Sequence, residues 1–301
     1  MTLSAVSTNL RGVLLMAAAV AAFAVMDVAL KRLVESYPAM QVTCLRGIAS
    51  LPLLLGAIAA FGRMNDLAPQ RWRLHAIRAF LGVATLWFFV YSVSILSLAD
   101  AYAIFMCAPL LITALSVPML GDRVDGRRWL AVGAGLAGVL IVLRPTGTGL
   151  ITLGGLAALA AALGYALSAI TIRMLARTDT GAATVVWSLV GLTIISGIAA
   201  WPTWQPLQWQ HWPWIVLLGI TGAVGQYLIT LAFRRAPPPV IAPLEYTALG
   251  WGMLFDWLLW MAAPNARMLI GASVIVASGL YVIHREATTA QRLSTPARDA
   301  M

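Results

Sequence analysis

The amino-acid sequence predicts an all-α membrane protein in which ten transmembrane helices form two inverted five-helix repeats. Three features lead to this fold class: an apolar composition, a long run without charge, and a proline motif that occurs twice. Hydrophobic residues make up 61% of the chain and charged residues only 10%, whereas a soluble domain has about 25% charged residues. Most of the apolar surface must therefore face lipid.

The longest uncharged run indicates which kind of spanning element to expect. No Asp, Glu, Lys or Arg occurs between Thr180 and Phe233. A spanning helix needs about 20 apolar residues, so this run predicts two spans and the loop between them. Strands of a membrane β-barrel alternate apolar and polar residues, whereas apolar residues follow one another here without alternation. The spans are therefore predicted to be helices.

Ten such spans can be placed along the chain, separated by turn residues such as Tyr37-Pro38 and Gly121-Asp122. They are expected at about residues 11–34, 38–61, 74–97, 99–120, 127–144, 152–173, 181–201, 212–234, 238–260 and 265–284. The first span is expected to be retained, because it runs past the length of a signal peptide into Asp27 and Lys31. Residues 1–145 should form the first five-helix repeat, residues 150–286 the second, and residues 287–301 a flexible cytoplasmic tail.

Ten spans place both termini on one side of the membrane, and the basic residues indicate which side. Suppose that the N-terminus is cytoplasmic. Of the 20 Lys and Arg residues, only Lys31, Arg32, Arg144 and Arg267 then fall in outer segments, and Arg46 lies within a span. Positive charge accumulates on the cytoplasmic side of membrane proteins. We therefore expect a multi-pass protein of the inner membrane with both termini in the cytoplasm.

The tryptophans agree with this orientation. They crowd the expected outer loop between spans seven and eight and the outer end of span nine: Trp201, Trp204, Trp209, Trp212, Trp214, Trp257 and Trp260. Amphipathic rings prefer the depth of the membrane interface. Interface anchoring is therefore the first interpretation of this group, and a role in substrate binding is the alternative.

A motif that occurs in both halves indicates an internal duplication. Ala108-Pro109-Leu110, followed by Thr113-Ala114-Leu115, recurs as Ala242-Pro243-Leu244, followed by Thr247-Ala248-Leu249. Because each half has five spans, the second half should enter the membrane in the opposite sense. Inverted repeats of this kind are typical of secondary transporters, whose substrate site lies near the bilayer midplane between the halves.

The same residues carry a family resemblance. Leu98-Ala99-Asp100-Ala101, Ala108-Pro109-Leu110 and Leu120-Gly121-Asp122-Arg123, with Ala242-Pro243-Leu244-Glu245-Tyr246 in the second half, resemble the EamA repeat of the drug/metabolite transporter superfamily. Asp122 and Asp256 stand where this family often has Glu. The resemblance covers nearly the whole chain. It implies a ten-helix fold that moves metabolites such as amino acids across a bacterial inner membrane.

Three ionisable residues within the spans are candidates for the substrate site, because charge inside a bilayer is costly. Asp27 and Arg46 are expected at similar depth on helices joined by a short turn, so they could pair. Such a pair would be either structural or responsive to substrate and protons. Glu245 follows Pro243 and precedes Tyr246. It suits proton coupling or the binding of an ammonium group, and the alternative is a hydrogen bond to a neighbouring helix.

Aromatic and polar side chains at mid-depth form the second set of candidates. Trp87 and Tyr91 share one face of span three at helical spacing. The complete set of predicted substrate-binding residues is Asp27, Arg46, Trp87, Tyr91, Tyr102, Tyr165, Gln226, Glu245, Tyr246 and Trp251. Aromatic walls with a few polar groups suit amino acids and other amphipathic metabolites. Ordinary helix packing is the alternative for each ring.

These features favour a secondary transporter of small metabolites, with amino-acid export by alternating access as the leading hypothesis. Uptake of S-adenosylmethionine, riboflavin or a similar metabolite is the second hypothesis, and an integral membrane enzyme is the third. The basic residues are dispersed between spans, so nucleic-acid binding is not expected despite the net charge of +9. No motif predicts a cofactor or a metal site. Proton coupling and a monomer or weak dimer are compatible with the sequence.

Overall fold

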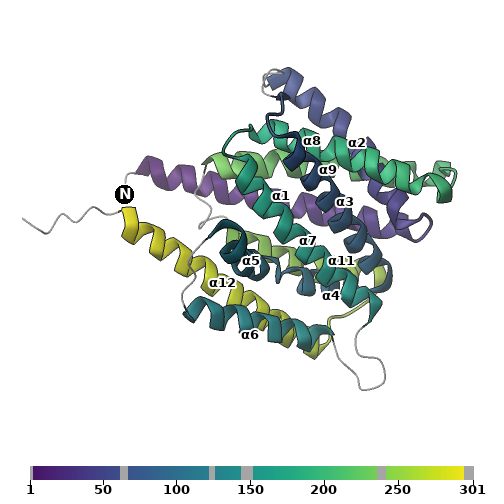
Figure 1. Ribbon diagram of the computed structural model, residues 1–301. Coiled ribbons are helices and arrows are strands. Elements are labelled where there is room, and N and C mark those ends of the chain that lie inside the picture. Colours follow the sequence, from purple (N-terminus) through teal and green to yellow (C-terminus); the bar gives the residue numbers. More distant parts are fainter. Residues whose placement is uncertain (1–2, 62–66, 122–125, 144–151, 236–241, 295–301) are drawn as a thin grey trace, which may run out of the picture.

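The computed structural model describes residues 3–61, 67–121, 126–143, 152–235 and 242–294 (Figure 1), and within them the regular elements are all helical. Eight segments are long and apolar enough to cross a membrane. They are α1 (Leu3–Val34), α2 (Ala39–Phe61), α3 (Trp72–Ile95), the consecutive α4 (Leu98–Phe105) and α5 (Ala108–Leu120), α7 (Leu153–Leu175), α8 (Gly181–Ala200), α9 (Trp212–Arg235) and α12 (Ala266–Ser294). The chain is thus a multi-pass helical membrane protein.

Two further helices lie in expected spans but are shorter. They are α6 (Gly126–Leu143) and α11 (Thr247–Trp260). The apolar part of α6 covers only Trp129–Val142, and α11 follows the 3-10 helix η4 (Ala242–Tyr246). The number of membrane crossings, ten in the sequence-based prediction, therefore stays a prediction.

The fourth and ninth expected spans differ from the prediction because neither is one continuous α-helix. The fourth span is interrupted at Met106 and Cys107, and the ninth span begins as the 3-10 helix η4. Both irregular points lie at the duplicated motif, next to Pro109 and Pro243. Proline lacks an N–H donor and clashes with the carbonyl four residues earlier. Proline alone does not decide the outcome, however, because Pro52 lies inside the uninterrupted α2.

The helices pack in a pattern that is preserved when the two halves are exchanged. Helix α1 of the first half packs along α9 of the second, as α7 of the second packs along α3 of the first. Helix α2 likewise contacts α9, as α8 contacts α3, and α6 lies against α12. The start of α1 and the end of α12 lie at the same end of the bundle (Figure 1).

Glycines allow the close approach of α6 and α12. A Cβ atom added at Gly138 would lie 2.9 Å from the carbonyl oxygen of Gly271, and one added at Gly271 would lie 2.8 Å from that of Gly138. Small residues let helix backbones approach closely in membranes. Helix α12 then continues to Ser294. Part of the segment 287–301, expected to be a flexible tail, is therefore helical, and residues 295–301 lie outside the described residues.

The tryptophan-rich loop connects α8 to α9 and is hydrogen-bonded to the first half at one end of the bundle, here called the tryptophan end. It contains η2 (Trp201–Thr203) and η3 (Trp209–His211). The Gln41 side chain donates to the Gln205 carbonyl at 2.8 Å and accepts from the Gln205 N–H at 2.9 Å. The Trp201 and Trp209 side chains remain largely exposed, as expected for rings that lie at a membrane interface.

Candidate functional site

The best-defined polar contact in the helix interior joins Asp27 of α1 to Tyr102 of α4. The Tyr102 hydroxyl donates to Asp27 Oδ2 at 2.6 Å, and both residues are buried. Apolar residues surround Tyr102 in the larger core cluster. A buried carboxyl group must be hydrogen-bonded to be tolerated there, and Tyr102 provides that bond.

A row of aromatic rings continues from Tyr102 into the second half. Tyr102 stacks on Phe89 of α3 with ring centroids 5.9 Å apart. Phe89 then meets Phe105 at 5.7 Å, and Phe105 meets Tyr165 of α7 at 5.4 Å. We call Tyr102, Phe89, Phe105 and Tyr165 the aromatic row. Contacting rings at these distances stabilise one another beyond their area burial, so the row is a continuous series of ring contacts across the halves.

Charged groups lie near the far end of the aromatic row. Glu245 of η4 and Arg78 of α3 both lie close enough to Tyr165 for their charges to act on its hydroxyl group. The Nε and Nη1 atoms of Arg78 are buried and have no hydrogen-bond partner, and neither has the hydroxyl of Tyr246. The row therefore runs from the Asp27 carboxyl at one end to the charges of Glu245 and Arg78 near the other.

At the tryptophan end, an ion pair links α1 to α11. Lys31 Nζ lies 3.2 Å from Asp256 Oδ1 and donates to the carbonyl of Leu96 at 3.2 Å. The Asp256 carboxylate also accepts the backbone N–H groups of Leu98 at 3.0 Å and Ala99 at 2.7 Å. These are orphan donors at the start of α4, so a residue of the second half caps a helix of the first.

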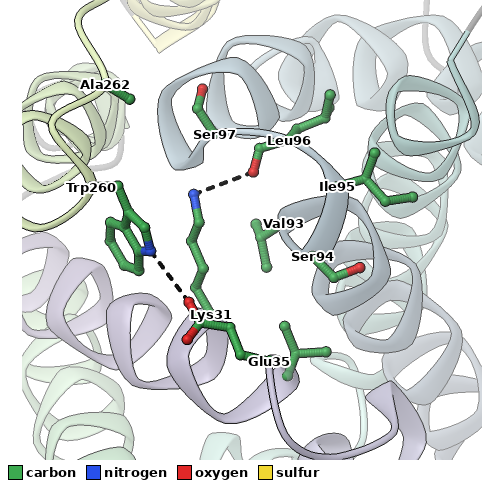
Figure 2. A pocket seen from close by; sticks show the side chains of 10 residues that line it. Lys31, Glu35, Val93, Ser94, Ile95, Leu96, Ser97, Trp260 and Ala262 are labelled. Carbon is green, nitrogen blue, oxygen red and sulfur yellow. Dashed lines mark hydrogen bonds between the residues drawn. The ribbon is translucent and has the colours of Figure 1, made fainter.

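A pocket of about 370 Å³ lies beside this ion pair, within the size range of sites for small ligands. Figure 2 shows Lys31 extending between the Leu96 carbonyl and the ring of Trp260, whose N–H donates to Glu35 at 3.3 Å. The ammonium group lies 4.5 Å from the centroid of the Trp260 ring. The pocket wall thus combines a cation, an indole ring and the backbone around Leu96.

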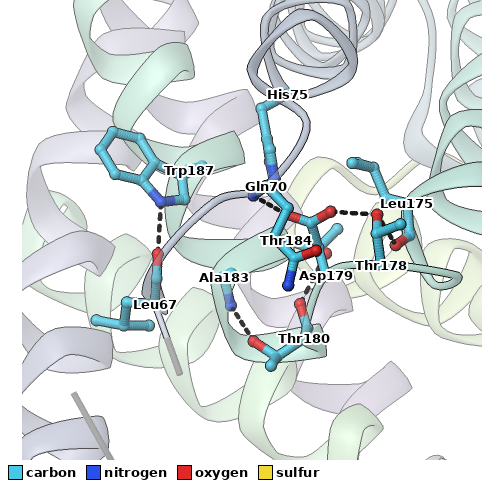
Figure 3. A network of polar contacts seen from close by, with 10 residues as sticks. All are labelled: Leu67, Gln70, His75, Leu175, Thr178, Asp179, Thr180, Ala183, Thr184 and Trp187. Atoms are coloured by element: carbon cyan, nitrogen blue, oxygen red, sulfur yellow. Dashed lines mark hydrogen bonds and ion pairs between the residues drawn. The ribbon is translucent and has the colours of Figure 1, made fainter. Parts of the chain in front are cut away.

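At the opposite end of the bundle, Asp179 joins the halves through a second polar network (Figure 3). His75 Nε2 lies 2.9 Å from Asp179 Oδ1, the Gln70 N–H donates to Oδ1 at 2.7 Å, and Thr178 donates to Oδ2 at 2.6 Å. Burial by itself would raise the pKa of the Asp179 carboxyl. The hydrogen bonds from Thr178, His75 and Gln70 outweigh it and lower the pKa to about 2.

The expected pairing of Asp27 with Arg46 is not a direct contact, although the charge of each residue acts on the other. Both residues are described by the structure, and no ion pair within 4.0 Å joins them. The hydrogen-bond partner of Asp27 is Tyr102 of α4. The depth of the two charges along their helices could be read from the sequence, whereas the hydrogen bond of the carboxyl group to α4 could not.

The other predicted site residues are dispersed. Trp87 contacts Phe88 and Tyr91, and no ring contact joins this group to the aromatic row. Trp251 stacks on Phe255 at 5.8 Å and packs against a separate small core cluster around Met16. Gln226 is half-buried on α9. The structure therefore brings together Asp27 and Tyr102 at one end of the aromatic row, and Tyr165 and Glu245 at the other.

Sequence reasoning missed Phe89, Phe105, Arg78, Asp256 and His75 as site or linking residues. Phe89 and Phe105 are ordinary residues in apolar spans and gave no signal. Arg78 was assigned to a cytoplasmic segment, yet it lies inside α3, so its position within a span was the signal that could have identified it. Asp256 and His75 contact residues of the other half, and such contacts can be identified only once the fold is known.

These contacts describe a multi-pass bundle of apolar helices whose two halves share buried polar groups and aromatic rings. The chain belongs to the EamA-like transporter family, which matches residues 10–144 and again residues 152–284. This membership confirms the resemblance that the duplicated motif carried. The tandem match also accounts for the recurrence of that motif in both halves.

Similar proteins cover most of the chain. An uncharacterized transporter of Helicobacter pylori (strain J99) is 29% identical over 92% of this chain and 95% of its own. A riboflavin transporter of Rhizobium johnstonii is 31% identical over 79% of this chain and 77% of its own. One crystal structure of another protein has the same fold, with a TM-score of 0.61 and 21% identity over 98% of this chain and 100% of that chain.

Proposed function

We propose that this protein is a secondary transporter that moves a small amphipathic metabolite across a bacterial inner membrane by alternating access. One observation carries the proposal: the aromatic row crosses from the first half to the second in the helix interior, with the Asp27 carboxyl at one end and Glu245 near the other. A row of aromatic rings with polar groups near its ends suits a solute that has both characters.

The helix contacts, which correspond when the two halves are exchanged, support an inverted repeat of ten spans. The pair α1 and α9 corresponds to the pair α7 and α3 when the halves are exchanged, as expected if each half has the same internal arrangement. In such transporters the site lies between the repeats, where the aromatic row is found. The orientation that we propose has the tryptophan end outside and both termini in the cytoplasm, because basic residues accumulate at the other end.

The two polar networks between the halves suit alternating access. The contact between Lys31 and Asp256 joins the halves at the tryptophan end, and that between His75 and Asp179 joins them at the other end. Opening one side requires the network on that side to break while the opposite network holds. A rigid movement of one half against the other would do this.

Amino-acid export is the cargo and direction that we propose first, because the ammonium group of an amino acid matches a carboxyl group at an end of the row, and an apolar side chain matches the rings. Riboflavin transport is the second candidate, favoured by the similar riboflavin transporter of Rhizobium johnstonii. An isoalloxazine ring system would stack on the same row. Both candidates rest on the same surface, so they are distinguished by the polar groups of the cargo.

A flux screen in proteoliposomes tests the proposal. Purified protein is reconstituted, and uptake and counterflow of radiolabelled tryptophan, phenylalanine, leucine, lysine, S-adenosylmethionine and riboflavin are compared with empty liposomes. Saturable flux of at least one solute, accelerated by the same solute on the opposite side, is expected. The absence of any such flux for the whole panel in protein shown to be folded would contradict the proposal for these cargo classes.

A matched pair of variants links the flux to the aromatic row. Phe89 is buried in the row, whereas Phe80 lies on the same helix with its side chain 64% exposed. Phe89→Leu should lower flux roughly 3- to 10-fold, because it removes one ring of the proposed site, and a ring contact with the cargo is worth about 0.5–1.5 kcal/mol. Phe80→Leu should leave flux unchanged. Equal effects of the two changes would remove the row from the transport site.

Proton coupling through Glu245 is the remaining part of the proposal. A carboxyl group in apolar surroundings can take up and release a proton during a transport cycle, and the first repeat has Leu111 at the corresponding position. Glu245→Gln keeps the shape of the side chain and removes the titratable proton. The variant should lose the response of flux to an imposed pH gradient. A response identical to wild type would assign Glu245 to packing or cargo binding.

A further inference from the structure

Arg78 is a cation inside a membrane helix whose hydrogen-bonding capacity is not used within the protein. It follows the first turn of α3, and its side chain is only partly accessible. Its Nε and Nη1 atoms are buried without a partner, and no carboxylate among the described residues forms an ion pair with it. Buried donors of a charged group are among the most costly to leave unsatisfied.

The surroundings of Arg78 belong to the proposed transport site. Its positive charge acts on the hydroxyl group of Tyr165, which is the last ring of the aromatic row. Tyr165 is 39% exposed despite its position in the middle of α7, so its ring is not closed off by the packed helices. The charge of Glu245 acts on the same hydroxyl from the other side of the interface between the halves.

Glu245 forms no ion pair with Arg78 within 4.0 Å. If the two side chains formed an ion pair, Arg78 would be satisfied and the site would have no net preference for an anion. The charges of both residues instead act on Tyr165, and the Nε and Nη1 atoms of Arg78 lack a partner. A planar guanidinium group with free donors matches the geometry of a carboxylate or phosphate, to which it can donate two parallel hydrogen bonds.

We propose that Arg78 binds the anionic group of the cargo, a carboxylate or a phosphate, while the apolar part of the cargo lies against Tyr165 and Phe105. This inference rests on the proposed transport function and specifies its substrate class. It favours cargo such as amino acids over neutral riboflavin, which has no group of this kind. The ammonium group of an amino acid would then face Glu245.

A phosphate group could also come from a lipid, because Arg78 lies near the end of α3 that we expect on the cytoplasmic side. A headgroup at this position would satisfy the guanidinium without any role in transport. The two sources differ in what they predict. A cargo site distinguishes solutes by their anionic group, whereas a headgroup site responds to the lipid composition of the membrane.

Pairs of solutes that differ only in the anionic group provide the test. The probes are L-tryptophan against L-tryptophanamide, and riboflavin 5′-phosphate against riboflavin. Each is measured as an inhibitor of flux in the proteoliposomes, and also as a stabiliser of the purified protein against heat in detergent. The second measurement does not depend on flux. Both are repeated in Arg78→Gln, Arg78→Lys and the control Arg73→Gln, an exposed arginine on the same helix.

At least one pair should show a preference of roughly tenfold or more for the anionic member in wild type, the size expected for a charge-assisted hydrogen bond. Arg78→Gln should abolish the preference, Arg78→Lys should keep part of it, and Arg73→Gln should keep all of it. If Arg78→Gln does not fold, Arg78→Lys decides the question: its preference for the anionic solute should be smaller than that of wild type, because lysine cannot donate two parallel hydrogen bonds.

Three results would overturn the inference. One is equal inhibition and equal stabilisation by both members of each pair in wild type. Another is an unchanged preference in Arg78→Gln. The third is an effect of Arg78→Gln that follows the fraction of anionic lipid in the liposomes and ignores the solute. In each case flux itself can persist, so these results differ from failure of the transport proposal, in which no solute of the panel is carried.

Discussion

The ion pair between Lys31 and Asp256 should make a large contribution to stability, because both side chains are nearly inaccessible, with 11% and 2% exposure. Asp256→Ala removes the ion pair and the acceptor for two backbone N–H groups of α4. It leaves a buried ammonium group without a carboxylate. Breaking a buried pair from one side costs about 3–5 kcal/mol. Lys31→Met leaves Asp256 with its two backbone donors and should cost about 1.5–3 kcal/mol.

A double-mutant cycle in detergent measures the coupling free energy between Lys31 and Asp256. The free energy of unfolding is obtained by titration with SDS for wild type, both single variants and the double variant. Coupling of about 1–3 kcal/mol is expected for residues in one network. The control is the cycle for Arg32 and Glu35, whose exposed side chains lie 3.5 Å apart; screening limits that pair to about 0.2–0.5 kcal/mol. Equal coupling in the two cycles would refute the argument from burial.

Further predictions concern packing, pH and topology. Gly271→Ala should destabilise the protein by about 1–3 kcal/mol in the same unfolding titration, because its Cβ would meet backbone of α6, whereas Gly133→Ala, which has open space, should be neutral or slightly stabilising. The stabilisation that depends on ionised Asp179 should be fully present above about pH 4 and lost as the pH falls toward 2, because folding lowers its pKa to about 2; Asp179→Asn should flatten stability against pH across that window, and an unchanged slope would contradict the assignment. Cysteine at Gln208 should react with a membrane-impermeant maleimide only from outside intact cells and cysteine at Arg127 only after the cytoplasm is opened; the reverse pattern would invert the proposed orientation.

Helix positions were predictable because the length of an apolar run is a one-dimensional property. Continuous apolar residues and a lack of charge predict spans between residues 11 and 284 with no knowledge of contacts, although α1 and α12 extend beyond them to Leu3 and Ser294. Helix rotation was not predictable in the same way. In a soluble helix an apolar stripe identifies the buried face, but a membrane helix is apolar toward lipid and toward its neighbours alike. The sequence therefore gave the depth of Asp27 without the direction of its side chain.

The same reasoning explains which site residues were recovered. Glu245 and Asp27 were identifiable because a carboxyl group in an apolar run is unusual whichever way it points. Tyr102 and Tyr165 were identifiable only as rings at mid-depth, and Trp87 satisfied the same criterion without joining the row. Asp256 and Lys31 lie 225 residues apart, so only the packing of α1 against α11 reveals that they are partners.

The carboxylate that caps α4 belongs to the other half of the chain, and this affects how the protein is made. Lys31 leaves the ribosome 225 residues before Asp256, which is roughly 10–45 s at synthesis rates of about 5–20 residues per second. During that interval the ammonium group and the first N–H groups of α4 have no carboxylate partner and depend on water or lipid headgroups at the membrane surface. The first half therefore waits in an incomplete arrangement until α11 has been inserted. The two repeats mature together as one assembly, although one is synthesised long before the other.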